Sequence, residues 1–138
     1  MKLQDFDFRI WDGRKYVNNI KGGVYIHKKD TDVKCLNRNQ ACYDYEFQLD
    51  DLDNSNLEIE LFTGLYDKKD KKVYENDIVK VKSLYDYFLA KISIHKEGTF
   101  YFEGKNGDYI GSLIYLVEDE GYTIEAIGNI NENAELLK

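Results

Sequence analysis

The centre of the chain carries the pattern that decides its fold, and residues 61–79 read LFTGLYDKKDKKVYENDIV. Apolar residues stand on both sides of a charged run from Asp67 to Lys71. Such a run is solvated, so we predict a tight hairpin from Leu65 to Tyr74 with the charged run at its tip. Residues 63–64 and 75–77 are turn-forming types, and a further strand is expected after them.

Downstream of this hairpin the sequence predicts a compact β structure. Short runs of apolar and β-branched residues alternate with turn residues such as Glu97-Gly98 and Asn106-Gly107-Asp108. The predicted strands cover residues 78–84, 88–95, 99–103, 110–117 and 123–127. Several short strands within about sixty residues are typical of a small barrel, so we predict that residues 77–128 close into one. The tail predicts one helical turn over residues 131–137, with Asn131 as its N-cap.

Upstream of the hairpin, alternating apolar and polar residues predict a small, separate antiparallel sheet. Phe6 to Trp11 forms its first strand, Asp12-Gly13 the turn, and Tyr16 to Ile20 the returning strand. Further strands are predicted at residues 24–27, 42–49 and 57–61, and the polar residues 28–41 predict a loop or short helix. We therefore expect an N-terminal β subdomain at residues 1–65 and a barrel subdomain at residues 66–138.

Composition indicates a cytoplasmic protein. Of the 138 residues, 43% are hydrophobic, which is enough for a packed core, and no apolar run is long enough to cross a membrane. The N-terminus lacks the apolar stretch of a secretory signal. Cys35 and Cys42 are the only cysteines, and two such residues predict reduced thiols rather than a disulfide framework.

Residue types that usually carry catalysis or bind metals are few. His27 and His95 are the only histidines, and neither forms a metal-ligand pair with a cysteine or with the other. No Gly-rich loop follows a predicted strand to hold phosphate, and no nucleophile stands in a known motif. We therefore predict a non-enzymatic protein with no catalytic residue, no metal and no cofactor.

Three segments resemble the YopX family. The central residues 61–79 are similar to the family pattern Q-[YF]-T-G-L-x-D-x-x-G-x-x-[IV]-Y-E-G-D-I-V, and residues 8–12 match its F-R-x-W-D opening. Residues 124–137, IEAIGNINENAELL, are similar to its ending, I-E-V-I-G-N-I-x-E-N-P-E-L-L. Asp70 and Asn76 stand where the family has Gly, and Ala134 where it has Pro. Asp and Asn tolerate Gly-type turn conformations best, so we expect these turns to form.

The resemblance implies a fold and a biological setting. Members of the family resemble a two-part β protein, with an N-terminal sheet followed by an SH3-like barrel. They are encoded by phages and prophages, so the resemblance implies an accessory protein acting in the cytoplasm of a bacterial host cell, with no assigned biochemical activity. The shared motifs are rich in turn residues, which favours a structural explanation for them.

The surface chemistry favours a protein partner. The chain carries 19 basic and 26 acidic side chains, a net charge of −7, and residues 83–138 contain four lysines against ten acids. A surface of that sign repels nucleic acid. Tyrosine combines apolar area with a hydrogen-bonding tip and is common at protein interfaces. The aromatic residues proposed for such a surface are Trp11, Tyr85, Tyr87, Tyr101 and Tyr109.

A nucleic-acid-binding barrel is the alternative, because small barrels often bind single strands on a face with exposed aromatic residues. In that case the lysines of the hairpin tip would contact phosphate. These are Lys68, Lys69, Lys71 and Lys72.

The chain is also expected to form a homo-oligomer. The predicted first strand has Phe6, Phe8 and Ile10 on one face and Trp11 on the other. A subdomain of about sixty residues buries only about 60% of its unfolded surface, which leaves apolar area exposed. Such area is commonly covered by a symmetric partner, and Trp11 is the first expected contact.

Overall fold

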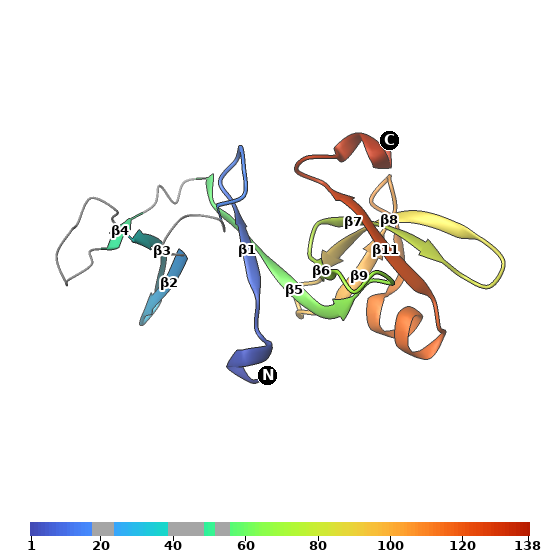
Figure 1. The fold of residues 1–138 in the computed structure, drawn as a ribbon, viewed down its shortest axis with the longest axis horizontal. Coiled ribbons are helices and arrows are strands. Elements are labelled where there is room, and N and C mark those ends of the chain that lie inside the picture. The colour runs from blue at the N-terminus through green and yellow to red at the C-terminus, as the bar shows by residue number, and fades with distance from the viewer. Residues whose placement is uncertain (18–23, 39–48, 52–55) are drawn as a thin grey trace. The chain divides into compact units, whose positions relative to one another are not determined.

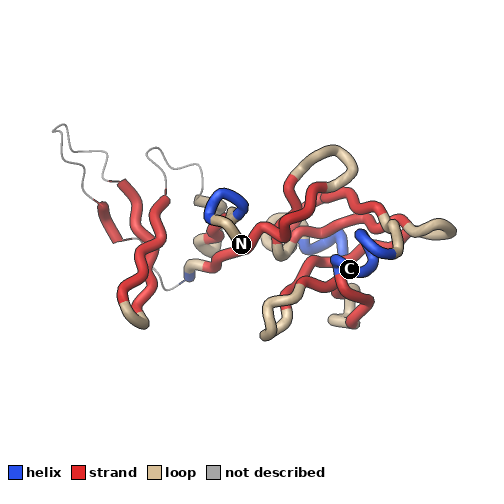
Figure 2. Tube along the Cα trace, turned by 90° about the horizontal axis from the view of Figure 1, so that it is seen from below, coloured by secondary structure: helices blue, strands red, loops and turns tan. Residues whose placement is uncertain are grey.

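The computed structural model describes residues 1–17, 24–38, 49–51 and 56–138. Antiparallel strands dominate these residues, and the helical segments are short (Figure 2). The chain divides into two compact units, one formed by Arg9–Glu60 and the other by Met1–Phe8 together with Leu61–Lys138. The prediction of a mostly β protein is confirmed.

The larger unit contains a five-stranded antiparallel sheet with the order β10-β9-β8-β7-β11 (Figure 1). Its strands are β7 (Asp77–Lys82), β8 (Tyr87–Ile94), β9 (Phe100–Glu103), β10 (Tyr109–Ser112) and β11 (Thr123–Asn129). Among the described residues no strand pairing joins β10 to β11, so the sheet is open. The prediction of a closed barrel over residues 77–128 is therefore wrong.

The chain leaves the sheet earlier than predicted after β10. The strand predicted at residues 110–117 ends at Ser112, and a helical turn, η3 (Tyr115–Asp119), follows. Leu113, Leu116 and Val117 have helical spacing and all pack on the core. Leu116 also lies over Gly111, where a Cβ atom would come within 2.7 Å of the leucine Cδ1.

Alternation along the strands separates a buried inner face from an exposed outer face. On β7, Val79 and Val81 are fully buried, whereas Lys80 and Lys82 are exposed. The hydrophobic core is formed by Val73, Val79, Val81, Ala90, Ile92, Phe102, Leu113 and Ile124. Because Phe102 is completely buried, its truncation to alanine would cost about 3–5 kcal/mol.

The predicted central hairpin is confirmed. β5 (Glu58–Tyr66) pairs with β6 (Lys72–Tyr74), with Phe62 opposite Tyr74 and Tyr66 opposite Lys72. The three-stranded sheet that contains them has the order β1-β5-β6, in which β1 is Phe8–Trp11.

The hairpin tip is less solvated than predicted. Residues 68–71 are exposed as expected, but Asp67 is only 5% exposed. Asp70 has a φ of 60° and Asn76 a φ of 69°, the conformation that Gly usually adopts. The expectation that Asp and Asn would take over these two turns is confirmed.

The smaller unit contains a second three-stranded sheet with the order β2-β3-β4. Its strands are β2 (Val24–Lys29), β3 (Asp32–Arg38) and β4 (Leu49–Asp51). The predicted loop or short helix at residues 28–41 is wrong over 28–38, because Asp30 at φ 53° turns β2 directly into β3. Charged residues on the exposed side of both strands hid this pattern. Residues 39–48, and with them nearly all of the strand predicted at 42–49, lie outside the described residues.

The first predicted hairpin forms in a shortened version. Phe6 lies before β1, which follows a 3-10 turn, η1 (Leu3–Asp5). A single bridge joins Trp11 to Tyr16, and the Asp12 carboxylate accepts two backbone hydrogen bonds that hold the turn. Residues 18–20 of the predicted returning strand lie outside the described residues.

A buried carboxylate holds the smaller unit together. Glu60 is fully buried and accepts hydrogen bonds from Arg9 Nε at 2.6 Å and from the Tyr16 hydroxyl at 2.9 Å. The Arg9 guanidinium also lies 4.8 Å from the centre of the Tyr16 ring. A buried carboxylate is tolerated only when it is paired and hydrogen-bonded in this way.

The short C-terminal helical turn is confirmed as η4 (Ala134–Leu137), but its N-cap is Asn133 rather than Asn131. The Asn133 side chain accepts a hydrogen bond from the Asn129 backbone N–H at 3.1 Å, so it anchors the end of β11. It also lies against Gly128, where a Cβ atom would approach within 2.6 Å. Only glycine fits there.

The backbone at Asp70 supports a stability prediction. At φ 60° an alanine is strained by about 1 kcal/mol, whereas glycine is not. We expect Asp70→Gly to be about 1 kcal/mol more stable to urea unfolding than Asp70→Ala. The same pair of changes at Asp108, an exposed turn residue without positive φ, is the control and should give the opposite order. Equal stability of the two Asp70 variants would contradict the role of backbone conformation.

Candidate functional site

The outer face of the five-stranded sheet carries most of the side chains proposed for binding. Ser93 of β8 lies opposite Tyr101 of β9, and Lys91 lies opposite Glu103. Tyr109 of β10 lies opposite Glu103 from the other side. Because Phe102 points into the core, its neighbours Tyr101 and Glu103 must point outward.

Three aromatic rings lie against one another at the β10 end of this face. His95 and Tyr101 have ring centres 4.1 Å apart and planes inclined by 20°. The centre of the Tyr109 ring lies 5.4 Å from that of Tyr101 and 5.7 Å from that of His95. Tyr109 is 59% exposed and His95 is also exposed. We call His95, Tyr101 and Tyr109 the aromatic cluster.

A polar network lies beside the aromatic cluster. Glu103 accepts hydrogen bonds from Lys91 Nζ at 2.8 Å and from the Ser93 hydroxyl at 3.0 Å. The Lys91 ammonium lowers the pKa of the Glu103 carboxyl, partial burial opposes this, and Ser93 lowers the pKa further. Glu103 therefore stays ionised beside Tyr109, in an ion pair with Lys91.

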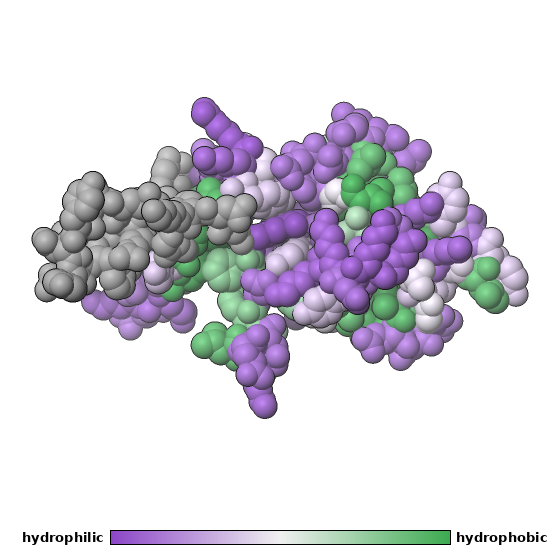
Figure 3. All heavy atoms as spheres, viewed as in Figure 1, coloured by the Kyte–Doolittle hydropathy of each residue, from purple (hydrophilic) through white to green (hydrophobic). Residues whose placement is uncertain are grey.

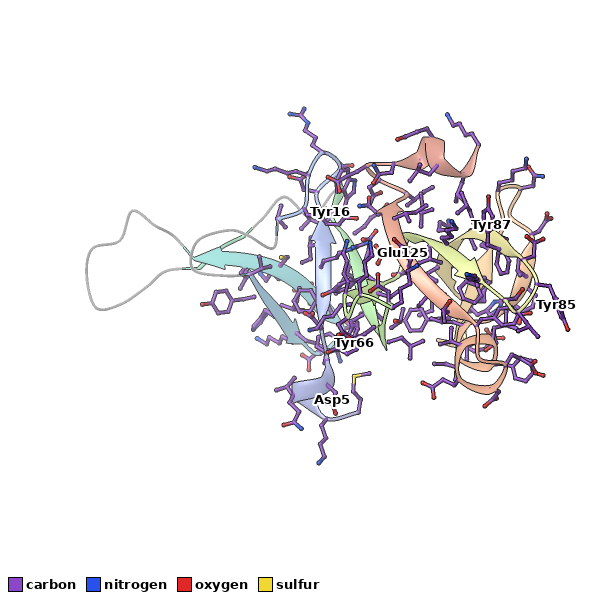
Figure 4. All side chains as sticks on the ribbon, turned by 45° about the vertical axis from the view of Figure 1, so that its right-hand side comes forward. Asp5, Tyr16, Tyr66, Tyr85, Tyr87 and Glu125 are labelled. Atoms are coloured by element: carbon purple, nitrogen blue, oxygen red, sulfur yellow. The ribbon has the colours of Figure 1, made fainter. Side chains whose placement is uncertain are left out.

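The other predicted aromatic residues do not belong to this cluster. Tyr87 begins β8 whereas His95 follows its end, roughly 25 Å away along a strand. Tyr85, in the turn before β8, is 93% exposed and projects into solvent (Figure 4). Trp11 belongs to the smaller unit, where it is half-buried and packs edge-on against Tyr16.

His95 was missed in the sequence analysis, although the sequence contained a signal for it. Lys91, Ser93 and His95 alternate with apolar residues, which places them on one exposed face. What no pattern could supply was the register that sets His95 beside Tyr101.

The four lysines proposed as phosphate contacts do not act as one group. Lys68 and Lys69 contact the two oxygens of Glu125 at 2.8 and 3.1 Å. Hydrogen bonds from these two lysines lower the pKa of Glu125. In contrast, Lys72 pairs with Asp7 at 2.9 Å, and Lys71 is exposed.

Asp67 fixes the hairpin tip to the sheet. Its carboxylate accepts backbone hydrogen bonds from Lys69 at 2.8 Å, Lys71 at 2.9 Å and Ala126 at 3.0 Å. Burial of the carboxyl works against ionisation, but the N–H groups of Ala126, Lys71 and Lys69 outweigh it. They hold the pKa of Asp67 below its ordinary value of 3.8.

Other polar residues of the central segment also bond to the backbone. The Asn76 N–H donates to the Ile92 carbonyl at 2.7 Å, and the Asn76 carbonyl accepts from Ile130 at 2.9 Å. The Asp77 carboxylate accepts from the Tyr74 N–H at 2.8 Å. These contacts hold the strand ends together, which supports a structural explanation for the segment.

The described part of the chain contains no group of three or more His, Cys, Asp or Glu side chains arranged to hold a metal. Cys35 is buried, and burial raises the pKa of its thiol, whereas Cys42 lies outside the described residues. Across the same residues, no helix has the length and apolar character that a membrane crossing requires.

Comparison with known proteins agrees with this architecture. The family model described as YopX protein matches residues 7–138. The chain belongs to the YopX family. The fold of this YopX family chain is similar to the crystal structure of yopX from Bacillus subtilis, with a TM-score of 0.62 and 22% identity over 95% of this chain and 97% of that one.

A second structure from the comparison is protein EF1440 from Enterococcus faecalis. Its TM-score is 0.60 and its identity 23%, over 96% of this chain and 98% of that one. No curated protein matches the sequence. These likenesses concern the YopX fold.

The contacts of Asp67 predict a pH-dependent loss of stability. Asp67→Asn removes the charge and sets an amide among N–H donors, so we expect it to lower the free energy of unfolding at pH 7 by about 2 kcal/mol. Because the folded-state pKa is depressed, the contribution of Asp67 is complete above pH 3.8 and is lost as the pH falls through the folded-state value. The difference in the free energy of unfolding between wild type and Asp67→Asn should therefore become smaller below about pH 4.

Urea unfolding at a series of pH values measures this gap. Asp86→Asn is the matched control, because the exposed Asp86 carboxylate accepts only the N–H of its neighbour Tyr87. That change should stay within about 0.5 kcal/mol of wild type. If the difference in unfolding free energy between wild type and Asp67→Asn stays constant down to pH 2.5, the ionised Asp67 carboxylate does not have the stabilising role described above.

Proposed function

We propose that this YopX family chain is a non-catalytic protein-binding module and that the aromatic cluster is its contact surface. The observation that carries the proposal is the mutual contact of three rings on the outer sheet face, in which His95 and Tyr101 are stacked and Tyr109 is tilted against both. Mutually stacked rings are held in place before a partner arrives, so little side-chain entropy is lost on binding. Tyrosine is among the residue types enriched in binding hot spots.

The neighbouring strand adds a second mode of contact. β10, which supplies Tyr109, is an edge strand of the sheet. The unpaired N–H and C=O groups of an edge strand form hydrogen bonds with an added strand from a partner. A partner peptide paired with β10 would lie beside the aromatic cluster, and ring contacts would select its side chains.

The charges around the aromatic cluster favour protein over nucleic acid. Surfaces that bind single strands combine aromatic rings with a positive groove. Here the exposed Asp108 precedes Tyr109, the carboxylate opposite Tyr109 is Glu103, which is paired with Lys91, and the chain as a whole carries a net charge of −7. A nucleic acid stacked on these rings would bring its phosphates close to carboxylates.

The proposed setting is the cytoplasm of a bacterial cell, where the chain would act as an accessory protein of a phage or prophage. The resemblance of its motifs to the YopX family supports this setting. The similar structures come from Bacillus subtilis and Enterococcus faecalis, so a bacterial lysate is the appropriate source of partners.

The proposal predicts loss of partner binding when the cluster is truncated. The full chain serves as bait in a nuclease-treated bacterial lysate, and affinity for the captured protein is then measured with purified components. We expect Tyr101→Ala with Tyr109→Ala to weaken binding at least thirtyfold, about 2 kcal/mol. Tyr85→Ala is the control, since Tyr85 is more exposed but outside the cluster, and it should change affinity less than threefold.

Two results would contradict the proposal. One is a partner whose affinity is equal for wild type and the double variant. The other is a protein that is captured from an untreated lysate but not from the nuclease-treated lysate, which would favour the nucleic-acid alternative.

Self-association is a second prediction of the protein-binding proposal. In the smaller unit, the exposed side chains Ile26, Val33 and Ile59 line an apolar hollow of about 230 Å³. Light scattering of the full chain at micromolar concentration should give a mass above 16.2 kDa. A mass equal to one chain would contradict it, and Trp11→Ala tests whether the half-buried Trp11 contributes to the interface.

A further inference from the structure

From the geometry between β7 and β11 we infer a binding site for a phosphate monoester carried by a small molecule. The site is a hollow of about 170 Å³ in the larger unit, on the outer face of the sheet. We call it the lysine hollow; its lining consists of Ile124 and of the polar or aromatic residues Lys68, Lys80, Lys82, Tyr87, Thr123 and Glu125. It lies at the opposite end of β8 from the aromatic cluster, so it is a separate site.

Strand register explains why these side chains converge. On β7, Lys80 and Lys82 are two residues apart and point away from the core. Lys80 lies opposite Glu125 of β11, and Lys82 lies opposite both Thr123 of β11 and Tyr87 of β8. Every one of these positions is on the outer face.

The hairpin tip brings in the third lysine. The backbone N–H of Lys68 donates to the Ile124 carbonyl at 3.0 Å, which places the tip against β11. Figure 3 shows hydrophilic side chains gathered where β11 and this hairpin face the viewer. Lys68 therefore reaches the hollow from a segment more than fifty residues distant from β11 in the sequence.

The lysine hollow has unused positive charge. The two oxygens of Glu125 contact Lys68 and Lys69, so the only acidic residue lining the hollow is already paired. The Lys80 ammonium lies 4.3 Å from the centre of the Tyr87 ring and, within the described residues, makes no ion pair. Lys82 likewise has no carboxylate partner in the part of the chain that the structure describes.

Two hydroxyl donors complete the chemistry. Thr123 and Tyr87 line the same hollow, and neither side-chain hydroxyl has a hydrogen-bond partner among residues 1–17, 24–38, 49–51 and 56–138. Ammonium and hydroxyl groups directed at one small volume form charge-assisted hydrogen bonds with phosphate oxygens. Together they match a phosphate dianion better than a neutral ligand.

The size and surroundings of the hollow favour a small phosphorylated molecule over a nucleic acid. At about 170 Å³ it is below the roughly 300 Å³ at which pockets for drug-sized ligands begin. The positive charge does not continue as a track along the sheet, because Asp86 precedes Tyr87 and the far end of the face carries Glu103. A nucleic acid strand needs such a track for several consecutive phosphates.

Amide NMR titration of the full chain with inorganic phosphate tests the site, with sodium chloride at equal ionic strength as the reference. Phosphate should shift the amide signals of Lys80, Lys82, Tyr87, Thr123 and Glu125. We expect Lys80→Gln with Lys82→Gln to weaken the apparent affinity at least tenfold. Lys96→Gln is the control, because it removes an exposed lysine near the other end of β8, and it should change the apparent affinity for phosphate less than twofold.

Unchanged amide signals elsewhere in the sheet show that the double variant is folded. Thr123→Val removes one hydroxyl without altering the charge, and it should weaken phosphate binding about threefold. Absence of phosphate-specific shifts, equal affinity in the double variant, or an equal loss with Lys96→Gln would overturn the inference. A twelve-nucleotide oligo-dT without a terminal phosphate is the second arm. Binding of this oligonucleotide more than tenfold tighter than phosphate would overturn the assignment to a small molecule in favour of a nucleic acid.

Discussion

The Asp67 carboxylate accepts hydrogen bonds from three backbone N–H groups that belong to two separate segments. Lys69 and Lys71 lie in the hairpin tip, and Ala126 lies in β11, 59 residues away from Asp67 in the sequence. A charged acceptor with several backbone donors is among the stronger polar interactions in a protein. It joins the tip to an edge strand of the sheet and covers part of that edge, which would otherwise be open to pairing with other chains. The position of Lys68 at the lysine hollow depends on this contact.

The outer face of the sheet combines two surfaces of different chemistry. At the β10 end, stacked aromatic rings lie beside the ionised Glu103. Near β11, lysines and hydroxyl groups surround a hollow whose only lining carboxylate is already paired. Because β8 runs between the two surfaces, both are held on one rigid element.

The YopX motifs are explained largely by backbone contacts. The Asn76 backbone is hydrogen-bonded to Ile92 and to Ile130, and the Asp77 carboxylate accepts the Tyr74 N–H. The turn residues of the central segment therefore hold the ends of neighbouring strands together. The side chains of the aromatic cluster lie outside that segment, whereas Lys68 of the lysine hollow lies within it.

Local patterns in the sequence were sufficient to predict the class of fold, the central hairpin and the outward position of Tyr101, because alternation is a property of neighbouring residues. The turns at Asp70 and Asn76 were predictable for a similar reason, since φ preference belongs to the residue itself. The open sheet was not predictable, since the end of β10 depends on Leu116 packing over Gly111. The burial of Asp67 was likewise hidden, because its Ala126 donor is distant in the sequence. The aromatic cluster and the lysine hollow arise from strand register. Register is set by packing of the whole sheet, and only the tertiary structure decided which exposed side chains became neighbours.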